Sequence, residues 1–435
     1  MKLIRTSANF VKKLLPKKLF KKVEPYGHLI EAVLMNMIYG FSSRKMHVIG
    51  VTGTNGKTTT TFLIHKMLNE AGYKVGMLST VAYGIGDDIK NQMVHMTTDE
   101  AGTLQRRLKE FKKAGVEWVV LETSSHALAQ YRVWGVPYEI AVMTNVTNDH
   151  LDYHETFENY LNAKRRLFKI ANKHGRRFGV VNADDPNADK FINAIKNSTT
   201  YGIKKGDLRA KDVKLAPDYC EFRATVEEDE YSIHVNIPGE FNVSNALAAV
   251  AVGRRIGLTR EQIEKGISAL KSVEGRMSTI DEGQKFKVII DFASTPDAFE
   301  RLFESVRPVT KGKLISVFGS AGRRDEVKRP VQGEIAGKYS DEVIITEEDD
   351  RDVDGEEILE QIAKGAEKAG KTEGRDLFMV HDRQEAIQFA LTRAKSSNDT
   401  VVFLGKGHEK TIERADGVHP WNETEVVRKA LKKIK

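Results

Sequence analysis

The sequence predicts an α/β protein with a central parallel-sheet domain of the P-loop type, followed by a second, Rossmann-like α/β domain. From residue 46 onwards, short apolar runs alternate with stretches of helical periodicity, which is typical of parallel strands joined by helices. A chain of 435 residues with 40% hydrophobic content can also bury more than one core. We therefore predict a basic N-terminal extension at 1–45, a central domain at 46–278 and a C-terminal domain at 279–435.

The first series of apolar runs predicts the buried strands of the central sheet. Residues 213–239 then alternate polar and apolar side chains, which is typical of antiparallel strands, so we expect a small sheet at the edge of the same domain. An Ala-rich helix is expected at 242–256, with Gly257 as its stop. The predicted strands of this series are 46–51, 118–123, 140–146 and 178–183.

A second series of apolar runs, again separated by helical stretches, predicts the C-terminal Rossmann-like sheet. Its strands are expected at 287–293, 313–319, 341–346, 377–382 and 400–406.

The net charge of +7 is concentrated at the beginning of the chain. Between Met1 and Lys22 there are eight Lys or Arg residues and no acid. This segment is either a solvated tail or cap, or a short basic amphipathic helix that contacts anionic lipid or a diphosphate. Elsewhere acids and bases are mixed evenly, so nucleic acid is not an expected partner.

Composition also bears on the compartment. No run reaches the roughly 18 apolar residues that a membrane span needs, and no secretion signal is recognisable, so we expect a cytoplasmic protein. Its single cysteine, Cys220, allows no internal disulfide and no multi-cysteine zinc site, and is interpreted as a half-buried residue without a chemical role.

A glycine-rich turn follows the first predicted strand and opens a helix. Backbone N–H groups and a helix N-terminus converge at such a turn, where they bind phosphate oxygens. Lys57 would neutralise phosphate charge and Thr58 would offer a hydroxyl to Mg²⁺. The strict pattern has glycine where this chain has Val51, so the site is a shortened variant. The turn predicted to bind ATP consists of Gly53, Thr54, Asn55, Gly56, Lys57, Thr58 and Thr59.

Potential metal ligands follow two later strands. Glu122 ends the run WVVLE, at the sheet edge where a carboxylate can hold Mg²⁺. The loop TNVTNDHLDYH is crowded with oxygen and imidazole donors, which indicates a second metal, a substrate contact or only an ordinary polar turn. These donors are Asn145, Asn148, Asp149, His150, Asp152 and His154.

The motifs together resemble the Mur ligases of cell-wall synthesis, most closely the UDP-N-acetylmuramyl-tripeptide synthetase branch. The matching pieces, in family order, are GVTGTNGKTTT, MTTDEAGTLQ, ETSSHAL, TNVTNDHLDYHETFENYLNAKRRLF, GEFNVSNALAA, GRM, DFASTPD, GSAGRRDEVKRP and GKGHE.

The resemblance implies an ATP-dependent amide-bond ligase of peptidoglycan precursor synthesis. In that reaction ATP converts the carboxylate of a muramyl dipeptide into an acyl phosphate, and an amino acid attacks it to give an amide, ADP and phosphate. Thr58 and Glu122 would hold one Mg²⁺, while His150 and Lys164 would hold a second. Lys164 aligns with a lysine that the family carbamylates with CO₂; the residues alone would favour an unmodified surface lysine beside Arg165 and Arg166.

The resemblance also assigns binding roles. Asn242 and Asn245 would hold the adenine side, and Arg276, Asp291 and Arg324 would close on ATP from the second domain. Thr97, Thr98, Ser125 and Arg132 would contact the carboxylate substrate, and Arg351, Gly405, His408 and Glu409 the incoming amino acid.

The chain departs from the family pattern in three places. Only about fifty residues precede the phosphate turn, so we expect the usual full N-terminal domain that grips the uridine diphosphate to be lacking. The segment 346–352 reads TEEDDRD where diaminopimelate-adding enzymes show Asn-Pro-Arg, with Arg351 retained, which favours lysine or diaminopimelate as the added amino acid. Ser294 replaces a histidine in DFASTPD.

Two alternatives remain open. The chain could be a folylpolyglutamate-synthetase-like ligase, which shares the phosphate turn and the two-domain plan, or a non-catalytic subunit that binds nucleotide and supports another enzyme. We expect a monomer that acts on small molecules.

Overall fold

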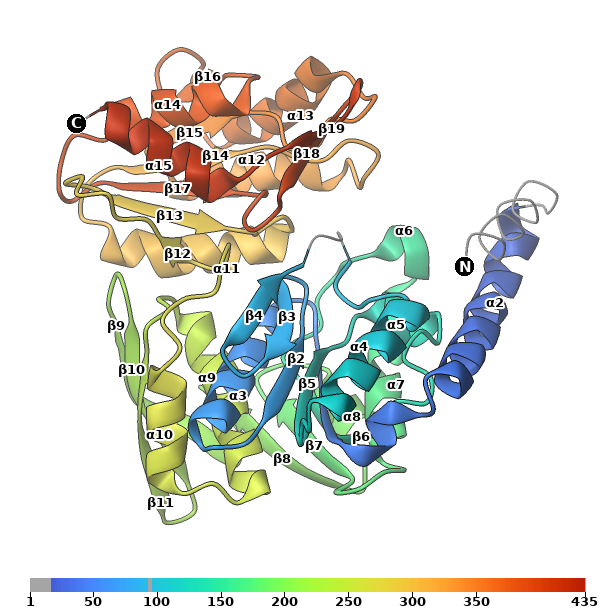
Figure 1. Ribbon diagram of the computed structural model, residues 1–435. Coiled ribbons are helices and arrows are strands. Elements are labelled where there is room, and N and C mark those ends of the chain that lie inside the picture. Colours follow the sequence, from blue (N-terminus) through green and yellow to red (C-terminus); the bar gives the residue numbers. More distant parts are fainter. Residues whose placement is uncertain (1–16, 93–95, 435) are drawn as a thin grey trace. The chain divides into compact units, whose positions relative to one another are not determined.

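The computed structural model describes residues 17–92 and 96–434 (Figure 1). The chain divides into two compact units. The first contains the chain up to Thr61, Gly72–Val146 and Tyr153–Thr200, and the second contains Phe62–Ala71, Thr147–Asp152 and Tyr201–Lys435. The domain boundary at residue 278 stays a prediction.

The larger sheet has eleven strands in the order β11-β10-β9-β8-β7-β6-β1-β5-β2-β3-β4. Its central neighbours run parallel, and most of their residues are buried, which explains their nearly continuous apolar sequences. The four strands predicted here are confirmed to within three residues. The strands of this parallel part are β1 (His47–Thr52), β2 (Val75–Leu78), β5 (Trp118–Glu122), β6 (Tyr138–Met143) and β7 (Phe178–Asn182).

Antiparallel strands extend both ends of this sheet. The stretch predicted to be antiparallel forms β9 (Leu208–Leu215), β10 (Cys220–Val226) and β11 (Asp229–Val235), which pair in sequence. Cys220 is fully buried rather than half-buried, and burial raises the pKa of its thiol to about 12, so it stays an unreactive thiol. The remaining strands are β8 (Asn197–Gly202), β3 (Ala82–Ile85) and β4 (Asp88–Asn91).

Helices connect these strands, and polar N-cap residues mark where several of the helices begin. The Ser124 side chain accepts from the Ala127 N–H at the start of α5 (Ser125–Ala129), and Thr156 does the same for α7 (Phe157–Ala171). The Ala-rich helix predicted at 242–256 is α9 (Glu240–Ile256), and it ends at Gly257 as expected. The others are α2 (Lys17–Ile38), η1 (Ser42–Lys45), α3 (Lys57–Glu70), α4 (Ala101–Lys113), α6 (Leu151–His154), α8 (Ala188–Ile192) and α10 (Arg260–Ser268).

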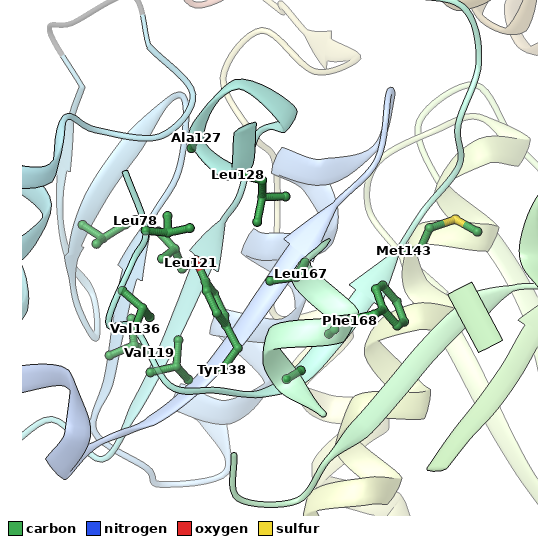
Figure 2. Close-up of a cluster of buried hydrophobic side chains, with 14 of the residues drawn as sticks. Leu78, Val119, Leu121, Ala127, Leu128, Val136, Tyr138, Met143, Leu167 and Phe168 are labelled. Carbon is green, nitrogen blue, oxygen red and sulfur yellow. The ribbon is translucent and has the colours of Figure 1, made fainter. Parts of the chain in front are cut away.

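Helix α7 buries one face in a hydrophobic core cluster of the first unit (Figure 2). Tyr160, Leu161, Leu167 and Phe168 recur at helical spacing on that face and pack in the cluster that includes Tyr138 of β6. Lys164 occupies the same face and is only 1% exposed. A lysine at a core position is unusual unless its charge is used, so its partners bear directly on function.

The second sheet has six strands in the order β12-β13-β17-β14-β15-β16, and all neighbours except β12 and β13 are parallel. All five predicted strands are confirmed. Parallel strands carry their carboxyl-end loops to one edge, so the segments after β13, β14, β15 and β17 meet there. The strands are β12 (Ser278–Thr279), β13 (Lys287–Asp291), β14 (Leu314–Phe318), β15 (Glu342–Ile345), β16 (Leu377–Met379) and β17 (Thr400–Leu404).

Further helices and one hairpin complete the second unit. They are α11 (Pro296–Val306), η2 (Arg307–Val309), α12 (Lys328–Tyr339), α13 (Gly355–Lys368), α14 (Arg383–Arg393), α15 (Glu423–Lys433), and the hairpin β18 (Thr411–Arg414) and β19 (Gly417–Pro420), which the sequence did not predict. Across the described ranges, none of the helices is both long and apolar enough to span a bilayer.

Candidate functional site

The glycine-rich turn lies between β1 and α3, as predicted, and is hydrogen-bonded to the segment that follows β6. The Thr54 N–H donates to the Asn145 carbonyl at 2.8 Å, and the Asn55 N–H donates to Asn145 Oδ1 at 2.9 Å. Thr144 Oγ1 donates to the Asn55 carbonyl at 2.6 Å. These three hydrogen bonds fix the shape of the turn.

Gly53 is required at this turn for two reasons. Its φ of +155° is unfavourable for other residues, and a Cβ placed there would lie 1.8 Å from Thr144 Oγ1. Lys57 Nζ donates to the Thr54 carbonyl at 2.8 Å, so the ammonium lies back over the turn. A turn of this kind at a helix N-terminus supplies both N–H donors and a cation for a polyphosphate.

Glu122 is confirmed at the end of β5, beside the first turn of α3. Thr58 Oγ1 donates to Glu122 Oε1 at 3.1 Å. Thr80, which sequence reasoning missed, donates to the same carboxylate through its hydroxyl at 2.8 Å and its N–H at 2.9 Å. Glu122 is 1% exposed, so these three donors satisfy a buried carboxylate and fix its orientation.

Lys164 projects from α7 to the same turn. Its Nζ donates to the Gly53 carbonyl at 2.5 Å and lies 4.4 Å from the centroid of the Tyr160 ring. The Tyr160 hydroxyl in turn is 3.0 Å from Thr54 Oγ1. The interpretation of Lys164 as an unmodified surface lysine is therefore wrong with respect to its location, because the side chain is buried against the phosphate turn.

The residues expected to contact the carboxylate substrate lie around the start of α5. Thr98 Oγ1 donates to the Glu122 carbonyl at 3.0 Å, and Arg132 Nη1 donates to the Thr98 carbonyl at 2.7 Å. Ser125 Oγ is 3.0 Å from His154 Nε2. Burial lowers the pKa of Arg132, opposed by acids that include Glu100. Thr97 is half-buried next to Thr98. Thr98, Ser125 and Arg132 are thus brought close to the Glu122 segment.

His150 belongs to the second compact unit. It has a positive φ of 54°, and its Nε2 lies 3.4 Å from Asp149 Oδ2. The described residues contain no cluster of three or more His, Cys, Asp or Glu side chains suited to a metal. A second metal site that includes His150 stays a prediction.

Thr58 and Glu122 fit one magnesium ion. Hydroxyl and carboxylate oxygens are ligands that Mg²⁺ prefers, and it usually takes only one or two carboxylates and completes its shell with phosphate oxygens and water. The two oxygens already lie within 3.1 Å of each other at a helix N-terminus that suits phosphate.

In the second unit, the residues expected near adenine are paired with each other. Asn245 Nδ2 donates to Asn242 Oδ1 at 2.9 Å, and Asn242 Nδ2 donates to the Pro238 carbonyl at 2.7 Å. Both side chains are buried in the first turns of α9.

The motifs GRM, DFASTPD and GKGHE meet at the carboxyl edge of the second sheet. Asp291 accepts from the Met277 N–H at 2.7 Å and from the Ala293 N–H at 2.8 Å, while burial raises its pKa against the opposing charge of Arg276. The Arg276 guanidinium lies 4.8 Å from the Phe292 ring centroid, and the His408 ring 4.9 Å from it. Arg324 is exposed in the loop between β14 and α12.

The segment TEEDDRD and the motif GKGHE also meet. Lys406, which was not predicted as a site residue, donates to Asp349 Oδ1 at 2.8 Å and to Glu409 Oε2 at 2.5 Å. It is fully buried, and although burial opposes its charge, Glu409 and Asp349 raise its pKa overall.

Arg351 makes its own set of contacts at this edge. Its Nε donates to Glu413 Oε2 at 2.8 Å and its Nη1 to the Gly322 carbonyl at 2.6 Å. Burial raises the pKa of Glu348, whose oxygen lies beside Gly405, to about 7. The edge therefore holds a dense group of carboxylates around one buried lysine.

Comparison with known proteins agrees with these motifs. The family "Mur ligase middle domain" matches residues 51–253, and "Mur ligase, glutamate ligase domain" matches residues 275–407. A UDP-N-acetylmuramyl-tripeptide synthetase of Roseiflexus sp. is 41% identical over 424 residues, covering 94% of this chain and 83% of that protein. A UDP-N-acetylmuramoyl-L-alanyl-D-glutamate--2,6-diaminopimelate ligase of Clostridium acetobutylicum is 39% identical, covering 98% and 86%.

Solved structures give the same result. A diaminopimelate ligase of the same description superposes with a TM-score of 0.63 at 31% identity, over 89% of this chain and 79% of the other. Folylpolyglutamate synthase of Mycobacterium tuberculosis reaches 0.72, over 93% and 95%, but at 15% identity it shares only the fold. With relatives near 40% identical over almost the whole chain, the protein belongs to the Mur ligase family.

Proposed function

We propose that the protein is an ATP-dependent ligase of peptidoglycan precursor synthesis, which joins an amino acid to the carboxylate of a muramyl dipeptide and releases ADP and phosphate. The observation that supports it most directly is the glycine-rich turn at the N-terminus of α3, where Thr58 Oγ1 and Glu122 Oε1 lie 3.1 Å from each other. A carboxylate is a poor electrophile, so an amide bond requires activation first, and a polyphosphate site supplies the means.

The chain's own residues would divide the chemistry as follows. The N–H groups at the N-terminus of α3 and the Lys57 ammonium bind the phosphates of ATP and stabilise charge on the transferred group. Magnesium, held by Thr58 and Glu122, would neutralise the phosphate oxygens when bound. Arg132 and the polar groups around Thr98 orient the substrate carboxylate. The carboxylate oxygen then bonds to the γ-phosphorus as ADP leaves, and the neutral amine displaces phosphate from the resulting acyl phosphate.

Carbamylation of Lys164 is part of this proposal. An ammonium that points at the phosphate turn would repel a nearby Mg²⁺, whereas a carbamate at the same place is an anion that supports a cation. Burial of Lys164 and its contact with Gly53 favour this role. With isotope-labelled bicarbonate, the protein without substitutions should give an NMR carbamate signal, and the Lys164→Ala variant should give none. A spectrum without the signal at saturating bicarbonate would reject the modification while leaving the ligase assignment standing.

We further propose that the added amino acid carries a second amino group. Asp349 and Glu409 both accept from Lys406, and Arg351 is occupied by Glu413, so this edge presents two carboxylates to a single buried ammonium. A distal ammonium would restore the balance, which suits lysine or diaminopimelate.

The decisive experiment measures ADP and phosphate release with Mg²⁺, ATP and UDP-N-acetylmuramoyl-L-alanyl-D-glutamate against a panel of amino acids. Turnover is expected with lysine or diaminopimelate and not with alanine or glutamate. Lys57→Ala should lower kcat by about 100- to 1,000-fold, because it removes one preorganised stabiliser of phosphoryl charge. Lys66→Ala, in the same helix and ion-paired with Glu70 at 2.9 Å, is the matched control and should retain activity.

Two results would replace the proposal. ATP binding without turnover on any amino acid would indicate the non-catalytic nucleotide-binding subunit. Turnover on a folate acceptor instead would indicate the folylpolyglutamate-type ligase, with which the chain shares a fold.

A further inference from the structure

Helix α2 presents an apolar face to solvent. Between residues 23 and 38, every side chain of the helix that the structure shows as exposed is apolar, apart from Gly27, which has none. These side chains recur every three or four residues, so they share one side of the helix. They are Val23, Tyr26, Ile30, Leu34, Met37 and Ile38, with exposed fractions from 42% to 62%.

This concentration is not typical of the rest of the surface. Of the thirteen large apolar side chains that are exposed among the described residues, these six come from one helix. Scattered exposed apolar residues need no explanation, but a continuous stripe marks a surface that binds something.

The opposite face of α2 is firmly attached to the first unit. Ala32, Met35 and Asn36 are buried, and Asn36 Nδ2 donates to the Trp134 carbonyl at 2.8 Å. Glu31 lies on the flank of the helix and pairs with His28 at 3.8 Å. The exposed stripe is therefore the outer face of an anchored helix.

The charge of the sequence that leads into this stripe identifies the partner. The first 22 residues contain eight Lys or Arg and no acid, and α2 begins within this run at Lys17. A basic segment that continues into an apolar helix face is the pattern that binds anionic lipid surfaces. A second copy of the chain would bring the same positive charge against itself, so it fits the surface less well.

The mode of binding also follows. None of the helices in the described part of the chain can cross a bilayer, so α2 would lie in the plane of the surface with its apolar stripe inserted. We propose that α2 docks the protein on an anionic lipid bilayer through Val23, Tyr26, Ile30 and Leu34, with residues 1–22 supplying electrostatic attraction. This inference does not depend on the ligase activity.

Co-sedimentation of the full chain with vesicles tests it. Vesicles of phosphatidylcholine with phosphatidylglycerol should bind the protein about ten-fold more tightly than vesicles of phosphatidylcholine alone, and added salt should weaken the binding. Leu34→Glu should reduce binding about ten-fold or more, because a carboxylate replaces an inserted apolar group.

Leu215→Glu is the matched control, because Leu215 is exposed to 40% and Leu34 to 42%. It should bind like the unmodified chain, and circular dichroism should show both variants folded. Equal binding to neutral and anionic vesicles, or undiminished binding by Leu34→Glu, would overturn the proposal. So would sedimentation that reveals a dimer abolished by Leu34→Glu without vesicle binding, which would identify a second copy as the partner.

Discussion

The carboxylate of Glu122 depends on a threonine that no motif contains. Thr80 contributes both a hydroxyl and an N–H to it, and such supporting groups typically change metal affinity by about 10- to 100-fold when removed.

Thr80→Ala should therefore raise the Mg²⁺ concentration needed for half-maximal ADP formation by about 10-fold or more, with a smaller effect on turnover at saturating Mg²⁺. Thr80→Ser keeps the hydroxyl and should behave like the unmodified chain. A Thr80→Ala variant with an unchanged Mg²⁺ requirement would show that the Thr80 hydroxyl does not orient the Glu122 carboxylate.

A second residue, Glu348, links stability to pH. Its pKa in the folded protein, about 7, lies above the ordinary value of 4.5 because the carboxyl is buried. The folded protein thus keeps a proton that the unfolded chain releases, so the contribution of this group to stability is fully present below pH 4.5 and is lost as pH rises through about 7.

Glu348→Gln should remove this loss. Near pH 8 the variant should resist urea better than the unmodified chain, by about 2–3 kcal/mol, and the difference should vanish towards low pH. Urea midpoints of both proteins, measured between pH 4 and pH 8, test this prediction. If the free energy of unfolding changed with pH in the same way in both proteins, Glu348 would already be charged in the folded state at low pH.

At the scale of elements, α12 and α13 pack with their backbones in close approach. A Cβ at Gly333 would lie 2.0 Å from the Ile362 carbonyl oxygen, and a Cβ at Gly365 would lie 1.8 Å from that of Pro330. The two helices can meet this closely only because both glycines lack side chains.

Gly333→Ala should destabilise the protein by about 1–3 kcal/mol through overpacking, although alanine is the better helix former. Gly27→Ala in α2, where a Cβ would meet nothing within 4 Å, is the control and should leave stability equal or higher by about 0.5–1 kcal/mol. Urea midpoints compare the two. If both variants were more stable by a similar amount, α12 and α13 would be able to move apart without loss of stability.

The pairing of strands explains why some site residues could be predicted from the sequence and others could not. Gly53 to Thr59 and Glu122 belong to local motifs at the ends of apolar strands, which sequence displays directly. Thr80 reaches Glu122 because β2 lies beside β5, with Leu78 opposite Leu121. That register is a property of the assembled sheet, and the short run VGML of β2 gave no clear strand signal.

Across the whole molecule, sequence periodicity predicted both sheets because parallel strands buried on both faces are continuously apolar. The convergence of Lys406 with Asp349 depends on the spatial order of β14, β15 and β17, which chain order does not state. Most of the basic tail at 1–22 lies outside the described residues, whereas the apolar outer face of α2 became visible only once the burial of its other side was known.

The fit between Gly53 and Thr144 has an evolutionary consequence. Because the threonine hydroxyl fills the volume that any side chain at position 53 would need, the two sites cannot drift independently. A side chain at position 53 should be tolerated in descendants of this gene only after residue 144 has become smaller and a new donor for the Asn55 carbonyl has arisen. Such a double change is rarer than either substitution alone, so selection is expected to hold this pair together over long divergence.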